Sequence, residues 1–210
     1  MARRTVVSMP GDGIGQTVLP EAIRVLDAVG FEADYVHADI GWEFWIKEGN
    51  PLPERTVDLL AEHGLGLFGA ITSKPKNEAT AELSPELQGK GLVYYSPIVG
   101  LRQRFDLDVC IRPCRSFAGN PLNFIRRTAD GGWEEPLVDA AIFRQNTEGL
   151  YGGVEWTDPP PDVRNAFESH AKFERFADTP GPDLAVSSRI FTRRACARIT
   201  RAAFEYAAKH

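Results

Sequence analysis

Short apolar runs alternate with segments of helical periodicity through the first hundred residues, and this alternation constrains the fold more than any other feature. The expected strands are 5–9, 31–38 and 65–70, and the expected helices are 16–29, 41–48 and 53–63. Strands that alternate with helices favour a parallel sheet covered by helices. The sequence therefore predicts an α/β fold built on an open sheet.

A glycine-rich turn, residues 10–15, follows the first expected strand. Its glycines, Gly11, Gly13 and Gly15, lack the G-x-G-x-x-G spacing of a standard dinucleotide fingerprint. Asp39 lies near the distance at which a ribose-binding acid is expected, but its strand context is ambiguous. We interpret the turn as a tight strand–helix junction lining a cleft, not as a standard Rossmann motif.

Three arginines are expected at the borders of elements in the middle of the chain. Arg102 lies beside a helical face, Arg112 leaves an alternating strand before a proline stop, and Arg144 follows the apolar run 138–142, which predicts a buried strand. Guanidinium groups match carboxylates with two hydrogen bonds, so these residues indicate a site for a small polyanion. The alternative is three unrelated surface ion pairs, each contributing little.

The remaining segments place the other candidate residues. Residues 74–95 are polar and are expected to form an active-site loop or lid, with Thr72 and Ser73 at its start. These two hydroxyls are positioned either to bind a ligand or to cap the following turn. Alternating patterns predict strands at 150–156, 170–176 and 184–190, and a final helix is expected at 193–209.

Composition excludes several classes of function. The 210-residue chain has a net charge of −5 and no block of like charge, so neither a nucleic-acid nor a membrane surface is expected. Neither a leader peptide nor a membrane-spanning run is expected. The three cysteines lack C-x-x-C spacing, which indicates reduced thiols in the cytoplasm. Cys110 and Cys196 are predicted to be buried, and the histidines show no metal-ligand spacing.

Four segments in register resemble one family. Residues 96–113 (SPIVGLRQRFDLDVCIRP) and 143–156 (FRQNTEGLYGGVEW) are similar to two segments of the β-decarboxylating dehydrogenases, which include isocitrate, homoisocitrate, 3-isopropylmalate and tartrate dehydrogenases. Residues 9–15 resemble the family's opening turn, and residues 69–73 its nicotinamide-side loop.

The resemblance implies a particular fold and assembly. It implies the isocitrate/isopropylmalate dehydrogenase-like open sheet, with the C-terminal part of that fold absent from this chain. Residues 1–107 would belong to the large domain and residues 108–210 to the small domain. A clasp-like arm around 150–188 would join two subunits into a homodimer.

The resemblance also implies an activity: the metal-dependent oxidative decarboxylation of a 2-hydroxy acid, a hydroxy-tricarboxylate or dicarboxylate. NAD or NADP would accept the hydride, and Mg²⁺ or Mn²⁺ would be bound by ligands that are not in this chain. Tyr151 would donate the proton that quenches the enol. The substrate-binding residues would be Ser96, Arg102, Arg112 and Arg144, and the cofactor-binding residues Ile14, Thr72, Ser73 and Asn146.

Two departures from the family pattern bear on the substrate. Gln145 stands where the isocitrate and homoisocitrate branches have glutamate, and Ile98 stands where isocitrate enzymes have asparagine. The expected order is isocitrate, then homoisocitrate, then isopropylmalate or tartrate. A hypothesis from another class stays open: a non-catalytic regulatory or truncated subunit that binds the acid and pairs with a complete subunit.

Overall fold

The structure is a computed structural model that describes residues 3–210. The chain divides into two compact units, one ending at Phe105 and the other extending from Asp106 to His210. This division falls two residues before the expected boundary at 107.

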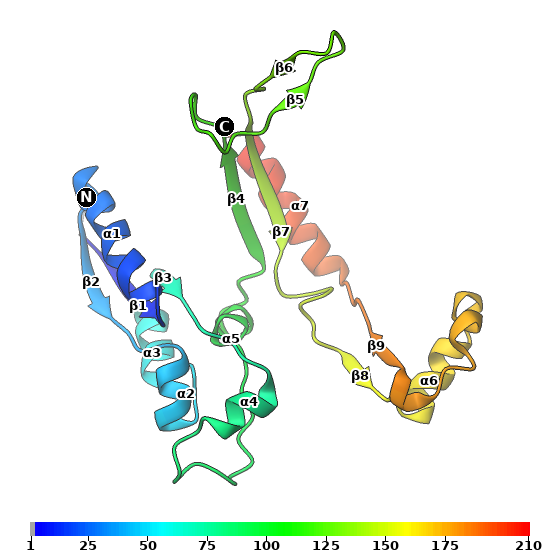
Figure 1. The fold of residues 1–210 in the computed structure, drawn as a ribbon. Coiled ribbons are helices and arrows are strands. Elements are labelled where there is room, and N and C mark those ends of the chain that lie inside the picture. Colours follow the sequence, from blue (N-terminus) through cyan, green and yellow to red (C-terminus); the bar gives the residue numbers. More distant parts are fainter. Residues whose placement is uncertain (1–2) are drawn as a thin grey trace. The chain divides into compact units, whose positions relative to one another are not determined.

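A three-stranded parallel sheet forms the centre of the first unit (Figure 1). Its strands are β1 (Arg4–Gly11), β2 (Ala33–His37) and β3 (Gly66–Ala70), in the order β2-β1-β3. Helix α1 (Gly15–Ala28) connects β1 to β2 and packs against β1 and β3. The open parallel sheet predicted from the sequence is confirmed.

Four further helices complete this unit. They are α2 (Trp42–Glu48), α3 (Glu54–His63), α4 (Lys76–Ala81) and α5 (Pro97–Arg104). Helix α4 lies inside the segment that was expected to be a polar loop, so that expectation is wrong for these residues. The physical reason is the burial of Ala79 and Leu83, which pack against α2 and give this short segment an apolar anchor.

Two apolar clusters stabilise the first unit. One lies between the sheet, α3 and α5, and contains Val7, Met9, Ala38, Ile40, Leu52, Val57 and Leu101. The other joins α2 to α4 and to the segment that precedes α5, and contains Trp42, Trp45, Ala79, Leu83 and Tyr94. Trp45 is fully buried, and its indole N–H donates to the carbonyl of Ala79 at 2.7 Å.

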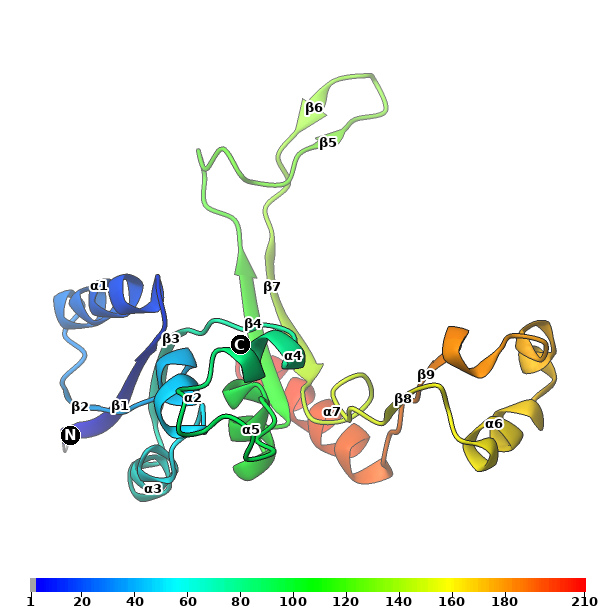
Figure 2. The ribbon, with the colours of Figure 1, turned by 60° about the horizontal axis from the view of Figure 1, so that its bottom comes forward.

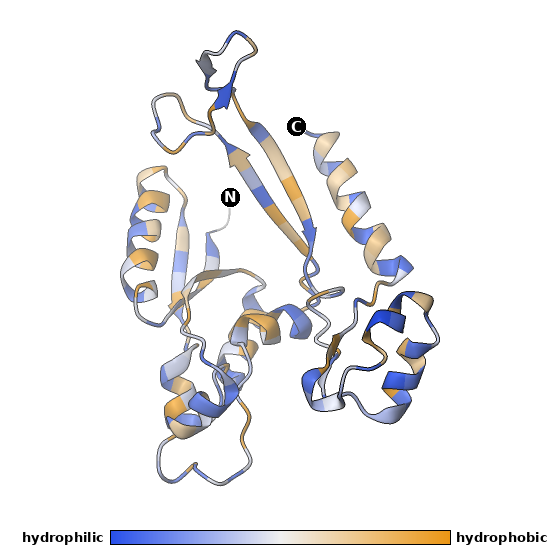
Figure 3. Ribbon diagram, turned by 45° about the vertical axis from the view of Figure 1, so that its right-hand side comes forward, coloured by the Kyte–Doolittle hydropathy of each residue, from blue (hydrophilic) through white to orange (hydrophobic). Residues whose placement is uncertain are grey.

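An antiparallel ribbon forms the centre of the second unit. It pairs β4 (Val109–Arg115) with β7 (Asp139–Gln145), and α7 (Arg193–Ala207) packs against both strands. Hydrophilic and hydrophobic residues follow one another along both strands (Figure 3). A hairpin of β5 (Arg126–Arg127) and β6 (Trp133–Glu134) lies beyond the end of the ribbon (Figure 2).

Strand β4 corrects the expected position of Arg112. The strand continues through Pro113 to Arg115, so Arg112 lies within it and not at its exit. In a two-stranded sheet each strand has one unpaired edge, and a proline at such an edge removes no ladder hydrogen bond. The proline therefore does not end the strand.

Strand β7 is less buried than its apolar sequence predicted. Asp139, Ala140 and Ile142 are exposed, with 54% of the surface of Ile142 accessible. Among the described residues, helix α7 packs against this ribbon and the ribbon has no third strand. Cys196 on α7 is also exposed, and Cys110 is only half-buried, so the predicted burial of these two cysteines is wrong.

A long connection, residues 146–192, separates β7 from α7. It pairs β8 (Glu155–Thr157) with β9 (Ala185–Ser187) in an antiparallel ribbon, and the segment between these strands contains helices. These are α6 (Pro161–Glu168) and the 3-10 helices η1 (Ala171–Phe176) and η2 (Gly181–Asp183). A strand was predicted at 170–176. Instead, Phe173 packs against Phe176, one helical turn further along the chain, and against Phe167 of α6.

No helix within residues 3–210 is long and apolar enough to cross a membrane.

Candidate functional site

Arg112 and Arg144 share one face of the β4–β7 ribbon. Arg112 pairs with Ile142, and Arg144 pairs with Cys110. Cross-strand partners point to the same face, and side chains alternate between faces along each strand. Arg112 and Arg144 are therefore diagonal neighbours, a spacing within reach of long side chains. The structure thus brings two of the three predicted arginines together.

Tyr151 completes this arrangement. The guanidinium carbon of Arg144 lies 4.7 Å from the centre of the Tyr151 ring. Nη2 of Arg144 also donates to Oδ1 of Asn146 at 2.7 Å. Arg144 is thus held between an aromatic ring and a buried amide, since Asn146 is only 7% exposed. A guanidinium and a phenol in contact provide a carboxylate-binding group beside a proton donor.

The segment after β7 is tied to the start of α7. The Glu148 carboxylate accepts hydrogen bonds from the backbone N–H and the hydroxyl of Thr192, both at 2.7 Å. These bonds, that of the backbone N–H first, hold the pKa of Glu148 below its ordinary value. Thr192 in turn caps α7 by accepting from the N–H of Ala195 at 3.1 Å. Glu148, adjacent to the predicted site, is therefore part of a helix cap.

Two aspartates precede β4 and contact the same arginine of α7. Arg198 donates to the carboxylate of Asp106, and its Nη2 lies 2.8 Å from Oδ1 of Asp108. The Arg198 guanidinium holds the pKa of Asp106 below its ordinary value. Asp108 is only 3% exposed, and Asp106 has a left-handed backbone with φ of 49°. The arginine therefore stabilises a backbone conformation that non-glycine residues rarely adopt.

A second group of predicted residues lies in the first unit, where β1 and β3 end. Asp12 organises this edge: its carboxylate accepts from the N–H of Trp42 at 2.7 and 2.8 Å and from the N–H of Thr72 at 2.9 Å. The N–H of Asp12 donates to the carbonyl of Ala70 at 2.7 Å. One carboxylate thus joins the glycine turn, the start of α2 and the segment after β3.

The predicted cofactor residues of this unit surround Asp12. Ile14, at the start of α1, is 65% exposed, and Ser73 is exposed. Thr72 is half-buried, and its carbonyl accepts from the hydroxyl of Tyr94 at 3.1 Å. The Tyr94 hydroxyl also lies 3.5 Å from Oγ of Ser73, while burial raises the pKa of Tyr94. Parallel sheets collect ligands at this edge.

The loop after β3 is held by a charged contact on an aromatic surface. The Lys74 ammonium group pairs with Glu82 and lies 5.3 Å from the centre of the Trp42 ring. The Trp42 indole N–H donates to the other oxygen of Glu82 at 2.8 Å. Lys74 first and Trp42 second hold the pKa of Glu82 below its ordinary value. These contacts fasten the first residues of the loop to α2.

Ser96 and Arg102 lie at the two ends of α5, also in the first unit. Ser96 is the residue before the helix and makes no capping hydrogen bond with its side chain. Arg102 lies in the last turn and is half-buried. Ile98, where isocitrate enzymes have asparagine, packs partly buried against the core of this unit.

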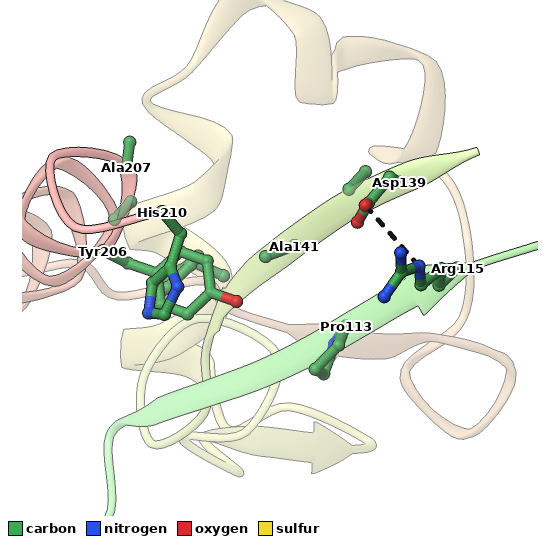
Figure 4. A pocket seen from close by; sticks show the side chains of 10 residues that line it. Pro113, Arg115, Asp139, Ala141, Tyr206, Ala207 and His210 are labelled. Carbon is green, nitrogen blue, oxygen red and sulfur yellow. Dashed lines mark ion pairs between the residues drawn. The ribbon is translucent and has the colours of Figure 1, made fainter. Parts of the chain in front are cut away.

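One hollow of the second unit is separate from the paired arginines. It has a volume of about 680 Å³ and lies between the ribbon and the end of α7 (Figure 4). Pro113 and Phe143 line it, and both alternate with the arginines along their strands. The hollow therefore lies on the α7 face of the ribbon, and Arg112 and Arg144 point to the other face.

Acidic, histidine and cysteine side chains do not cluster into a metal site within residues 3–210. Among the residues that the structure describes, no group of three or more His, Cys, Asp or Glu side chains could hold a metal ion. The acidic residues nearest the predicted site, Asp106, Asp108 and Glu148, are bonded to Arg198 and Thr192. No chemical step is therefore assigned to a metal held by these residues.

Four residues that organise these groups were not predicted from the sequence: Asp12, Tyr94, Asp108 and Arg198. Asp12 acts on residues 30 and 60 positions away, and Arg198 on residues more than 80 positions away. Periodicity reports only neighbours along the chain, so it contains no signal for such contacts. An acidic residue between two glycines was the one available indication at Asp12.

The fold defines an open-sheet α/β protein with one group of polar side chains at the carboxyl ends of β1 and β3 and a second group on the β4–β7 ribbon. A model of the isocitrate/isopropylmalate dehydrogenase family matches residues 5–210. The chain belongs to this family.

Known relatives are similar over nearly all of this chain. Homoisocitrate dehydrogenase of Methanocaldococcus jannaschii is 35% identical over 206 residues, which are 98% of this chain and 48% of the relative. Protein DlpA of Legionella pneumophila is 33% identical over 207 residues, 98% of this chain and 30% of the relative. The chain thus spans less than half the length of these relatives.

A solved structure shows the same architecture. The isocitrate dehydrogenase of Methylococcus capsulatus superposes with a TM-score of 0.68 at 28% identity, over 98% of this chain and 48% of the solved chain. The expected family and the partial family fold are confirmed.

Proposed function

We propose that this chain forms part of a cytoplasmic, NAD(P)-dependent dehydrogenase that oxidises and decarboxylates a 2-hydroxy acid with a carboxylate on the adjacent carbon. Isocitrate is the first candidate substrate, followed by homoisocitrate and then by isopropylmalate or tartrate. The observation that carries this proposal is the shared face of Arg112 and Arg144, with the Tyr151 ring stacked on Arg144.

The arginines would bind and orient the acid. Two guanidinium groups on one face of the ribbon can each donate two parallel hydrogen bonds to a carboxylate. Ser96, just before α5, and Arg102, in the last turn of this helix, are the proposed carboxylate-binding residues of the first unit. Holding the reacting carbon in a fixed orientation is a large contribution to catalysis, on the order of 7–11 kcal/mol in well-oriented systems.

Tyr151 would complete the reaction. NAD or NADP, when bound, would supply the hydride acceptor for C2, and the substrate hydroxyl would lose its proton to a base outside the residues named here. The C2 ketone then accepts the electron pair of the breaking carbon–carboxylate bond, carbon dioxide leaves, and an enolate remains. Tyr151 is the proposed donor of the proton to its carbon. Mg²⁺ or Mn²⁺ belongs to this proposal, with ligands outside the described residues.

Ile14, Thr72 and Ser73 are proposed to contact the nicotinamide part of NAD or NADP. The exposed Ile14 side chain offers an apolar surface, and the exposed Ser73 hydroxyl offers a hydrogen-bond partner for an amide. Asn146, predicted together with these residues, lies in the second unit and bonds to Arg144.

Position 98 bears on the order of substrates. Ile98 packs against the core and provides no amide for a third carboxylate. Homoisocitrate or a more apolar malate therefore stays in the proposal beside isocitrate.

The test is an assay that follows the absorbance of reduced nicotinamide with the purified chain. It contains Mn²⁺ or Mg²⁺, NAD⁺ or NADP⁺, and each of the four acids in turn. Tyr151→Phe is expected to lower kcat by about 10²–10⁴-fold, the usual contribution of a general acid. Arg112→Ala is expected to lower kcat/KM by about tenfold or more, because a charge-assisted bond is lost. Arg115→Ala, an exposed position on the same strand, is the matched control.

Two other outcomes are informative. Binding of one acid by calorimetry without reduction of the nicotinamide would favour the non-catalytic subunit. That hypothesis also predicts that the chain co-purifies with a full-length relative. A folded chain that neither binds nor oxidises any of the four acids contradicts the proposed function.

A further inference from the structure

Asn146 is the buried polar residue at the end of β7. Its backbone N–H donates to the carbonyl of Asp108 at 2.9 Å, and its Nδ2 to the carbonyl of Leu107 at 3.4 Å. Its remaining side-chain atom, Oδ1, accepts from Nη2 of Arg144 at 2.7 Å. Every polar group of the side chain is thus directed to a partner within this unit, and the side chain has little freedom to turn elsewhere.

Arg144 depends on this amide for its orientation. The guanidinium group has the Tyr151 ring on one side, and its Nε is buried without a hydrogen-bond partner among the described residues. The bond to Asn146 is therefore the directional contact that sets the angle of the guanidinium plane. A guanidinium that rotates freely could not present a fixed pair of N–H groups to a carboxylate.

The backbone that holds Asn146 is itself anchored to α7. Asp108, whose carbonyl accepts from Asn146, has its side chain buried against Arg198 at 2.8 Å. Arg198 also bonds to Asp106, whose backbone is left-handed. Helix α7 thus fixes residues 106–108, and these residues fix Asn146.

We propose that Asn146 is a positioning residue that orients Arg144 for carboxylate binding, and that Arg198 and Asp108 anchor Asn146 to α7. This inference rests on the proposed function, since it assumes that Arg144 binds the acid. It assigns Asn146 to the substrate-binding group, whereas the family resemblance implied a contact with the cofactor.

The test compares two substitutions that separate the oxygen acceptor from the size of the side chain. Asn146→Asp keeps an oxygen for Arg144, and Asn146→Leu keeps only the volume. The measured quantity is the solvent-exchange rate of the Arg144 Nε–H in an arginine-labelled chain by NMR. Its signal is assigned by its loss in Arg144→Lys.

The Nε–H is protected by burial, and this protection is expected to persist in Asn146→Asp. It should fall by about tenfold or more in Asn146→Leu, because a guanidinium group that has lost its Nη2 bond can turn and expose Nε to water. Asn165→Leu, an exposed position on α6, is the matched control and should change nothing. Protection in Asn146→Leu equal to wild type overturns the proposal, as does an equal loss in both variants.

Two additions keep the result interpretable. Where circular dichroism shows that Asn146→Leu does not fold, Asn146→Ser replaces it, because its shorter side chain cannot reach Arg144; retained protection in that variant also overturns the proposal. Arg198→Met should lower the protection of Arg144, and an unchanged rate overturns the anchoring role of α7.

Wild-type chain is then titrated with isocitrate, homoisocitrate, 3-isopropylmalate and tartrate. A shift of the Arg144 signal is expected with one of these acids. If none shifts it, the proposed function fails in this chain, whereas the orientation of Arg144 by Asn146 is decided by the variants alone.

Discussion

At the scale of single residues, a few carboxylates join segments that are distant in the sequence. Asp12 links the glycine turn to α2 and to the segment after β3, and Glu148 links the end of β7 to α7. Both carboxylates accept backbone N–H bonds at places where helices or loops begin. Charged acceptors make stronger hydrogen bonds than neutral ones. These two residues should therefore contribute more to the free energy of unfolding than surface carboxylates usually do.

Replacing Asp12 tests the first of these links. Asp12→Asn keeps the shape but removes the charge and one acceptor oxygen, so the N–H groups of Trp42 and Thr72 compete for one carbonyl. We expect a loss of about 1–3 kcal/mol in the unfolding free energy, measured by urea titration and tryptophan fluorescence. Asp27→Asn, on the exposed surface of α1, should change stability by less than about 0.5 kcal/mol. Equal stability of the two variants would contradict the role of Asp12.

The lowered pKa of Glu148 predicts that the free energy of unfolding depends on pH. Its pKa is depressed in the folded state, so its contribution is present above the unfolded value of 4.5 and is lost as the pH falls through the folded value. We expect the urea midpoint of the wild type to decrease on acidification below that value more steeply than that of Glu148→Gln. At neutral pH the variant should be less stable. Glu205→Gln, exposed on α7, is the control, and parallel pH curves for the wild type and Glu148→Gln would refute the prediction.

At the scale of elements, local pattern predicted most of what the structure shows. The three strands of the first unit and α1, α2, α3 and α7 lie close to their expected ranges, because each has a clear period and a turn at its border. The errors share a cause. Helix α4, the continuation of β4 through Pro113 and the 3-10 helix at 171–176 depend on packing partners or unpaired edges that only the folded chain defines.

The candidate site was predictable to a similar degree. The strand ends and the residue types indicated where the polar groups of the first unit would collect, whereas Arg112 and Arg144 lie inside their strands and not at the expected exits. The shared face of Arg112 and Arg144 could not be predicted, because it depends on the register between two strands separated by a long insertion. A shift of that register by one residue would place the two arginines on opposite faces.

Two glycines in the turn between β1 and α1 test how closely this turn packs against β3. Both have positive φ, but a Cβ at Gly11 would lie 1.9 Å from the carbonyl oxygen of Ala70, whereas one at Gly13 meets no atom within 4 Å. We expect Gly13→Ala to cost about 1–2 kcal/mol for the left-handed backbone alone. Gly11→Ala should cost at least about 3 kcal/mol, because overpacking is added. Urea unfolding of both variants measures the difference, and equal costs would exclude the close approach of β3.

Two tryptophans of different burial test how much the apolar cluster between α2 and α4 contributes to stability. Trp45 is fully buried among aromatic and aliphatic side chains, whereas Trp133 on the β5–β6 hairpin is 69% exposed. Trp45→Ala should lower the unfolding free energy by about 3–5 kcal/mol through lost burial and a cavity. Trp133→Ala should change it by less than about 0.5 kcal/mol. Thermal unfolding by circular dichroism compares them, and a small effect at Trp45 would contradict the role of this cluster.

At the scale of the whole molecule, the connection between β7 and α7 has little structure of its own to stabilise it. Strands β8 and β9 have three residues each and pair only with one another among the described residues. A two-stranded ribbon of this size is marginally stable in water. We therefore expect this arm, residues 150–188, to gain stability from a second copy of the chain, as the family resemblance implied.

The mass of the chain in solution measures this expectation. Light scattering coupled to gel filtration should give twice the chain mass of 23.2 kDa, with dissociation on dilution. Trp156 lies in β8, half-buried and paired with Val186, so Trp156→Ala should raise the dimer dissociation constant by about tenfold or more, since tryptophans dominate many interfaces. Trp133→Ala, on the exposed β5–β6 hairpin, should leave the dimer dissociation constant unchanged. A mass of 23.2 kDa at every concentration would mean that the arm needs no second copy, and an equal effect of both substitutions would place the contact elsewhere in the chain.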